Sequence, residues 1–125
     1  MKLKWFTPAL NDLKHIYNRS LINFGILLAD KISDQIHATI NQLGTFPGLG
    51  SIEPLLNHRP EPWRSLVIHR NVKVIYLIRQ ESVNIAALWD TRREPKSLAN
   101  YIDHIVQTEP AILNEPSIPY IKTDK

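Results

Sequence analysis

The chain has 125 residues, of which 43% are hydrophobic and 22% are charged, a composition typical of one globular domain with its own core. It has no cysteine, which excludes disulfides, thiolate-bound metals and a cysteine nucleophile. The formal net charge is +3, and residues 58–96 alone carry eight basic and four acidic side chains. A basic surface of this kind favours encounters with nucleic acid or with acidic proteins.

The N-terminal sequence MKLKWFTPAL has no long apolar stretch of the kind found in signal peptides. No apolar run approaches the ~20 residues of a membrane-spanning helix. The five histidines are widely spaced and form no recognisable ligand pattern. We therefore expect a cytoplasmic protein without membrane attachment, metal or cofactor.

The first half of the chain predicts a strand and two helices. Residues 2–6 alternate polar and apolar side chains, as a short strand does. Thr7 suits an N-cap and Pro8 suits the first helical position, so a helix should begin there and end near Gly25. A second helix is predicted over 26–43, and its apolar residues recur three and four apart: Ala29, Ile32, Ile36, Ile40 and Leu43. Two helices with so short a link should form an antiparallel hairpin.

The second half predicts a loop and then a meander. Residues 51–62 hold three prolines and are predicted to be a loop. Apolar and β-branched runs, separated by turns at Arg70-Asn71 and Glu81-Ser82, predict three strands: residues 63–69, 72–80 and 83–90. A short helix is predicted over 96–106. Trp5 and Phe46 are expected in the core.

These elements predict an α+β fold. An N-terminal strand and an antiparallel helix hairpin pack on a small, mainly antiparallel sheet in the order β-α-α-β-β-β, followed by a short C-terminal helix and an extended tail. The domain is predicted to span residues 1–106. Residues 107–125 contain three prolines, which exclude a long helix, and their apolar side chains favour an arm lying on a surface.

Basic residues gather around the predicted meander. Arg64 and Lys73 lie on adjacent strands, and Arg92 and Arg93 follow the last one. We expect these side chains to converge on one open face of the sheet. Guanidinium groups bind phosphate or carboxylate through two hydrogen bonds, so such a cluster suits an oxyanion or an acidic partner. The alternative is an ordinary ion pair between an arginine and a neighbouring acid such as Asp90.

Trp63 and Trp89 lie at the ends of predicted strands and allow two interpretations. An exposed aromatic ring there can stack on a base or pack against a partner. A buried ring instead closes the core against a helix.

Four stretches of the chain, in their order and spacing, resemble the RelE/ParE family of toxins: YNRSLINFG, ADKISDQIHATINQLGTFPGLG, WRSLVIHRNVKVIYLI and TRREP. The similarity covers about residues 2–98. Pro-x-x-Gly after the second helix, Arg-Ser-Leu-Val at the next strand and Arg-Arg-Glu-Pro after the last strand look most like the ParE members.

The resemblance implies the toxin of a type II toxin–antitoxin system, a class connected with plasmid stabilisation and growth inhibition. It implies a cognate antitoxin that wraps an extended segment and an amphipathic helix around the helix hairpin and the sheet. RelE-like members enter the ribosome and cut mRNA, whereas ParE-like members inhibit DNA gyrase and are not known as nucleases.

If the protein is a nuclease, the resemblance gives three residues a catalytic role: Arg64, Lys73 and Arg93. Leu66, however, occupies another position that is basic in RelE-like enzymes, and the family's tyrosine falls at Ala99, two residues from Tyr101. Arginine is a poor proton shuttle because it stays protonated. The nuclease set is therefore incomplete, which favours a ParE-like toxin that acts by binding.

For a binding toxin we expect target contacts from five residues: Arg70, Trp89, Arg92, Arg93 and Lys96. The expected target is DNA gyrase. The alternatives are a ribosome-dependent mRNA endoribonuclease, and an inactive relative that retains only binding. The sequence is compatible with a homodimer and with a toxin–antitoxin hetero-oligomer.

Overall fold

The computed structural model describes residues 1–108 of the chain. The elements follow in this order: β1 (Lys2–Trp5), α1 (Thr7–Phe24), α2 (Ile26–Thr45), the 3₁₀ turn η1 (Pro47–Leu49), β2 (Ser51–Ile52), the 3₁₀ turn η2 (Pro54–Leu56), β3 (Arg64–His69), β4 (Val72–Arg79), β5 (Ser82–Asp90) and α3 (Pro95–Thr108). Each predicted helix and strand is present. The predicted loop 51–62 also contains β2 and η2, which the sequence did not indicate.

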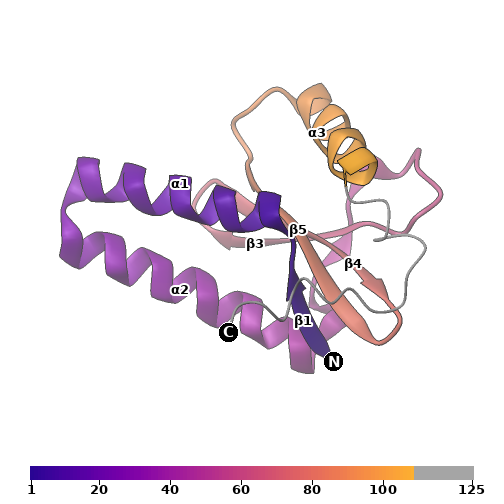
Figure 1. Cartoon of the computed structure of the whole chain (residues 1–125), viewed down its shortest axis with the longest axis horizontal. Coiled ribbons are helices and arrows are strands. Elements are labelled where there is room, and N and C mark those ends of the chain that lie inside the picture. The colour runs from indigo at the N-terminus through magenta and orange to yellow at the C-terminus, as the bar shows by residue number, and fades with distance from the viewer. Residues whose placement is uncertain (109–125) are drawn as a thin grey trace.

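The strands form one five-stranded sheet in the order β1-β5-β4-β3-β2 (Figure 1). β1 runs parallel to β5 and the other pairs are antiparallel, so the predicted mainly antiparallel α+β sheet is confirmed. α1 and α2 form the antiparallel hairpin, and the end of this hairpin projects beyond the sheet (Figure 1).

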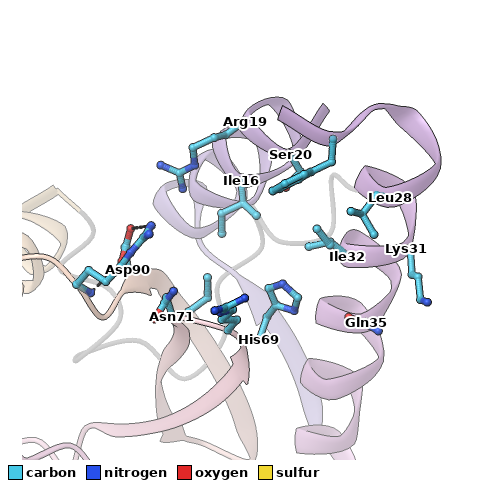
Figure 2. A pocket seen from close by; sticks show the side chains of 14 residues that line it. Ile16, Arg19, Ser20, Leu28, Lys31, Ile32, Gln35, His69, Asn71 and Asp90 are labelled. Carbon is cyan, nitrogen blue, oxygen red and sulfur yellow. Dashed lines mark hydrogen bonds and ion pairs between the residues drawn. The ribbon is translucent and has the colours of Figure 1, made fainter. Parts of the chain in front are cut away.

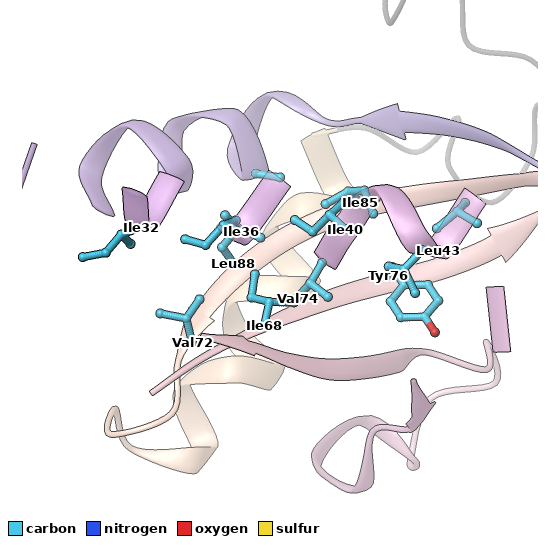
Figure 3. Close-up of a cluster of buried hydrophobic side chains, with 12 residues drawn as sticks. Ile32, Ile36, Ile40, Leu43, Ile68, Val72, Val74, Tyr76, Ile85 and Leu88 are labelled. Carbon is cyan, nitrogen blue, oxygen red and sulfur yellow. The ribbon is translucent and has the colours of Figure 1, made fainter. Parts of the chain in front are cut away.

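One face of the sheet is covered by the hairpin, mainly by α2. All five residues of the predicted apolar stripe of α2 are buried: Ala29, Ile32, Ile36, Ile40 and Leu43. They meet side chains from alternate positions of β4, among them Val72, Val74 and Tyr76 (Figure 3). The alternating apolar side chains of β4 and the helically spaced apolar side chains of α2 thus pack together in one interface.

The opposite face of the sheet is also covered, which corrects the expectation of an open face. Leu98, Ile102 and Ile105 of α3 are fully buried against this face. Their neighbours include Trp63 and Trp89, both of which are buried. Both tryptophans therefore close the core.

Two details near the helix ends differ from the predictions. Phe6, not Thr7, is the N-cap of α1. The Phe6 N–H donates to Ile85 O (3.0 Å), which continues the pairing of β1 with β5, so Phe6 keeps an extended backbone and the helix begins after it. α2 ends two residues later than predicted. Phe46 then falls beyond its last turn and is 61% exposed, so the prediction that Phe46 is a core residue was wrong.

A β-bulge in β3 determines which face its side chains occupy. His69 pairs with Val72 across the turn, and an unbroken ladder would place Ile68 opposite Lys73. The register shifts between Val67 and His69, so that Val67 lies opposite Lys73 instead. A one-residue shift moves every earlier side chain of the strand to the other face.

The C-terminal helix extends past the predicted domain boundary. Gln107 and Thr108 belong to α3, whereas the boundary was placed after residue 106. The rest of the predicted tail, residues 109–125, lies outside the described residues.

Candidate interaction site at the end of the sheet

The β3–β4 turn and the end of β5 lie side by side. Asn71 has a φ of 61°, a left-handed conformation that asparagine tolerates in tight turns. Its carbonyl accepts a hydrogen bond of 2.8 Å from the N–H of Thr91. This bond holds Arg70 and Arg92, which are distant in sequence, at the same end of the sheet.

Asp90 fixes the conformation of Arg92. One carboxylate oxygen accepts from the backbone N–H of Arg92 (2.9 Å) and from its Nε (3.0 Å), and the other accepts from Nη2 (2.8 Å). These bonds hold the pKa of Asp90 down at about 2. The ion pair expected as the alternative is thus present, yet the Arg92 side chain remains 66% exposed.

Arg93 lies against the indole of Trp89. The guanidinium carbon is 4.3 Å from the ring centroid, a cation–π geometry. Trp89 is only 2% exposed, and its ring also lies near that of Tyr101, with 5.6 Å between the ring centroids. Trp89 therefore supports the exposed Arg93 and does not itself present a surface to a target.

A groove with a volume of about 700 Å³ opens between the helix hairpin and this end of the sheet (Figure 2). Four basic side chains line it: Arg19 of α1, Lys31 of α2, Arg70 and Arg92. Among the described residues lining it, Asp90 is the only acid, and Asp90 is already paired. An apolar floor, which includes Ile16, Ile32 and Val72, completes the groove.

A smaller cavity of about 160 Å³ adjoins this groove and shares Arg19 and Asp90 with it. Asp12 of α1 and Arg93, which follows β5, both line this smaller cavity. Arg70, Arg92 and Arg93 therefore belong to one basic region. Lys96, the remaining predicted cation, is exposed in the first turn of α3 and lines neither cavity.

Asp12 is a functional candidate that sequence reasoning missed. Its two carboxylate oxygens accept from the N–H of Leu88 (3.0 Å) and from the hydroxyl of Tyr101 (2.9 Å), which joins α1, β5 and α3. Burial raises the pKa of Asp12, and burial together with the nearby carboxylate raises that of Tyr101. An acid between the apolar residues Ala9 and Leu13 was the signal available in the sequence.

Arg64 and Lys73 do not join the basic region. Because of the β-bulge, Arg64 lies opposite Tyr76 on the hairpin face, while Lys73 points to the face that α3 covers. The expected convergence of Arg64, Lys73 and Arg93 on one open face was therefore wrong.

Both residues contact the protein itself. Arg64 Nη1 donates to Gly50 O (2.5 Å), next to the Gly50 N–H that donates to the Tyr76 hydroxyl (2.9 Å). A Cβ on Gly50 would approach Ser65 O to 2.5 Å, so the site requires glycine.

Lys73 Nζ donates to the carboxylate of Glu53 at 2.5 Å, and Glu53 is buried. Burial alone would raise the pKa of Glu53, but the bonds from Lys73 and from the Leu55 N–H hold it below its usual value.

Within residues 1–108, every helix is too short or too polar to span a bilayer. The same residues contain no group of three or more histidines or acids placed to hold a metal ion.

Comparison with known proteins decides the family. The protein-family model for the ParE toxin of the type II toxin–antitoxin system parDE matches residues 3–95. The chain belongs to the ParE toxin family. The match ends at the first residue of α3, so it contains the whole hairpin, the sheet except for Lys2, and the Arg92-Arg93 pair of this ParE-family toxin.

The fold of this ParE-family toxin is shared with a solved structure. A chain from the chromosomal ParDE TA system of P. aeruginosa superposes with a TM-score of 0.62 at 23% sequence identity, over 72% of this chain and 95% of that chain. No match was found among curated protein sequences. The resemblance to the RelE/ParE toxins, on the ParE side, is thus confirmed.

Proposed function

We propose that this ParE-family toxin inhibits growth by binding DNA gyrase through the basic region at the end of its sheet. The observation that carries the proposal is the grouping of Arg70, Arg92 and Arg93, all exposed, beside a groove with an apolar floor. Cations arranged around a concave apolar surface suit a protein target with matching carboxylates.

Membership of a toxin–antitoxin family supports a second part of the proposal, a cognate antitoxin that neutralises the toxin. The antitoxin would act by covering the same basic region or by holding the toxin away from its target. A cytoplasmic site of action and a role in plasmid stabilisation belong to the same proposal.

Binding is favoured over RNA cleavage by the contacts of the basic residues. Cleavage by a 2′-hydroxyl needs a proton acceptor, a proton donor and cations that are free to hold the phosphate. Arg64 and Lys73 are engaged with Gly50 and Glu53. Tyr101 donates to Asp12 and has a raised pKa, which makes its phenolate a scarce base near neutral pH.

The test is a gyrase supercoiling assay with the full chain, run beside a translation reaction in which mRNA integrity is followed. We expect supercoiling to stop while mRNA remains intact. Normal supercoiling at saturating toxin would reject the proposal. Ribosome-dependent cuts in the mRNA would favour the nuclease, and unchanged growth on expression without antitoxin would favour an inactive relative.

A further inference from the structure

An uncharged apolar surface lies along the edge strand β2 and the two 3₁₀ turns that flank it. Four large apolar side chains of this segment are exposed: Phe46 (61%), Leu49 (46%), Ile52 (45%) and Leu55 (38%). We call these four residues the edge patch. Glu53 is the only charged residue between positions 43 and 57, and it is buried and paired with Lys73. The edge patch therefore offers apolar contact and no free charge.

The fold is anchored here by other residues. The Tyr76 hydroxyl donates to Pro47 O (2.7 Å) and accepts from the Gly50 N–H (2.9 Å), while Leu56 is buried beside α3. A Cβ on Gly48, in the middle of η1, would meet no atom of the described residues within 4 Å. β2 is also the last strand of the sheet as described. An exposed apolar surface beside a free sheet edge is a place where a further chain segment can add.

The chain itself supplies an apolar segment beyond α3. Residues 110–121 read PAILNEPSIPYI, and Glu115 is the only charged residue among them. The three prolines of this segment exclude a long helix, and proline fits a sheet only at its edge because it has no N–H to donate. Five large apolar side chains recur in it: Ile112, Leu113, Ile118, Tyr120 and Ile121. Its composition and its prolines therefore both match a sheet edge lined by apolar side chains.

The described end of the chain lies close to the edge patch. α3 packs against η2, where Ile105 shares a cluster with Leu56. Arg59, just after η2, forms an ion pair with Asp103 of α3. Thr108, the last described residue, thus ends a helix that is tied to the segment carrying the patch. The first apolar residue of the segment comes four positions later, within ~14 Å of extended chain.

The other exposed apolar surface, at the free end of the helix hairpin, fits this segment less well. That end lies on the far side of the molecule from α3 (Figure 1). The cations Arg19 and Lys31 line the groove that reaches it. Covering these cations with a nearly uncharged segment would remove them from water without supplying carboxylates, which is unfavourable. The edge patch sets no such cost, because it has no free charge.

We infer that residues 110–121 lie as an extended strap over the edge patch of their own chain, with their apolar side chains against its four residues. The strap covers the free edge of β2, where an exposed strand would otherwise offer itself to another chain. It also ties the end of α3 to the segment that follows α2. The strap lies outside the residues that the family model matches. The inference is independent of the proposed function, since it holds whether or not the protein binds gyrase.

The absence of cysteine makes cross-linking a direct test in the full chain. Gly48→Cys places a thiol in the edge patch and Ser117→Cys places one in the strap, and neither change removes an apolar side chain. In the control pair, Asn23→Cys at the exposed free end of the hairpin replaces Gly48→Cys. With a short bismaleimide, we expect the first pair to cross-link within one chain at least about tenfold faster than the control pair, because docking raises the effective concentration of the thiols. Equal rates in the two pairs would overturn the inference.

Serine variants of the cross-linking pair test whether apolar contacts hold the strap. Ile118→Ser/Ile121→Ser in the strap and Leu49→Ser/Ile52→Ser in the edge patch should each slow the cross-link about fivefold or more, because each change removes buried apolar area. Ile22→Ser/Leu27→Ser, at the exposed free end of the hairpin, is the matched control and should change the rate less than about twofold. Circular dichroism checks that each variant folds. Unchanged rates in both strap and patch variants would overturn the inference.

A second copy of the chain is the other occupant to distinguish. A mixture of the single variants Gly48→Cys and Ser117→Cys can cross-link only between molecules. We expect little dimeric product in this mixture at a concentration where the double variant gives cross-linked monomer. Dimers that form in the mixture as fast as the cross-link forms in the double variant would place the strap on a neighbouring molecule and overturn the inference.

Discussion

Two ion pairs emerge from neighbouring positions on opposite faces of the sheet, and they differ in how much water reaches them. Lys73, on the sheet face that α3 covers, pairs with Glu53, and the two side chains are 15% and 1% exposed. Asp90, which lies opposite Val72 on the other face, pairs with Arg92, and these side chains are 21% and 66% exposed.

The contrast separates a structural cation from an available one. A buried carboxylate is destabilising without its cation, because water cannot reach it to stabilise the negative charge. Lys73 therefore has a structural role as the partner of Glu53. An exposed pair contributes little to stability and can be exchanged for other contacts, so Arg92 remains available to the partner that we propose. From the sequence, both residues were expected to lie on one open face of the sheet.

The largest expected effect is on activity at the exposed pair. Arg92→Glu/Arg93→Glu should reduce gyrase inhibition at least about tenfold, because reversed charges repel the carboxylates that the arginines would meet. Supercoiling at a series of toxin concentrations measures it. Lys2→Glu, far from the groove, is the charge-matched control. Unchanged inhibition in the double variant, with intact folding, would contradict the assignment of Arg92 and Arg93 to the target surface.

The next effect is on stability at the buried pair. Lys73→Ala should lower the free energy of unfolding by about 3 kcal/mol, because it leaves the Glu53 carboxylate buried without a partner. Urea unfolding measures the change, and Arg70→Ala, at an exposed position, should stay within about 0.5 kcal/mol of the wild type.

A double variant sharpens the same point. Lys73→Ala/Glu53→Gln removes the buried charge together with its partner, while the lysine stem stays absent, and should recover much of the loss. Failure to recover would mean that packing of the lysine stem, and not the unpaired carboxylate, sets the cost.

The overall architecture could be predicted because two periodicities in the sequence agree with each other. The stripe from Ala29 to Leu43 has helical spacing, and the alternation of Val72, Val74 and Tyr76 has strand spacing. Both sets are buried against each other in the structure. A prediction that rests on a pattern repeated over a whole element stays correct when one residue is misassigned, as Thr7 is in the prediction of the N-cap of α1.

The candidate site was only partly predictable, because it depends on single residues without a repeating signal. The bulge in β3 contains neither glycine nor proline, so nothing marked the register shift that moves Arg64 away from Lys73. Glu53 lay in a stretch read as loop, which concealed the partner of Lys73. The position of Arg92 and Arg93 at the end of the sheet could be predicted because they follow a strand directly, where short connections constrain position.

Asp12 offers an intermediate case, since it is partly buried and lies beside Arg93. Asp12→Ala should lower the free energy of unfolding by about 2 kcal/mol, because the N–H of Leu88 and the hydroxyl of Tyr101 both lose their acceptor. Tyr101→Phe removes one bond and should cost about 1 kcal/mol. Urea unfolding measures both changes, and equal losses in the two variants would show that the bond to Leu88 contributes nothing.

The smallest expected effect is the pH dependence of the exposed pair. The pKa of Asp90 is about 2 in the folded chain, below its ordinary value of 3.8, so its contribution to stability is complete above about pH 4. As the pH falls from 4 to 2, the unfolded chain takes up the proton first and this contribution is lost. Asp90→Asn should therefore show a smaller loss of stability between pH 5 and pH 3 than the wild type, measured by urea unfolding at both values.

Asp12 supplies a control of opposite sign for that measurement. Its pKa is raised by burial, so the folded chain holds its proton more tightly and the ionised form counts against folding as the pH rises above the ordinary value. Asp12→Asn should then steepen the loss of stability on acidification, where Asp90→Asn makes it shallower. If both variants steepened the loss, Arg92 would not stabilise the Asp90 carboxylate, and the exposed pair would lose its electrostatic basis.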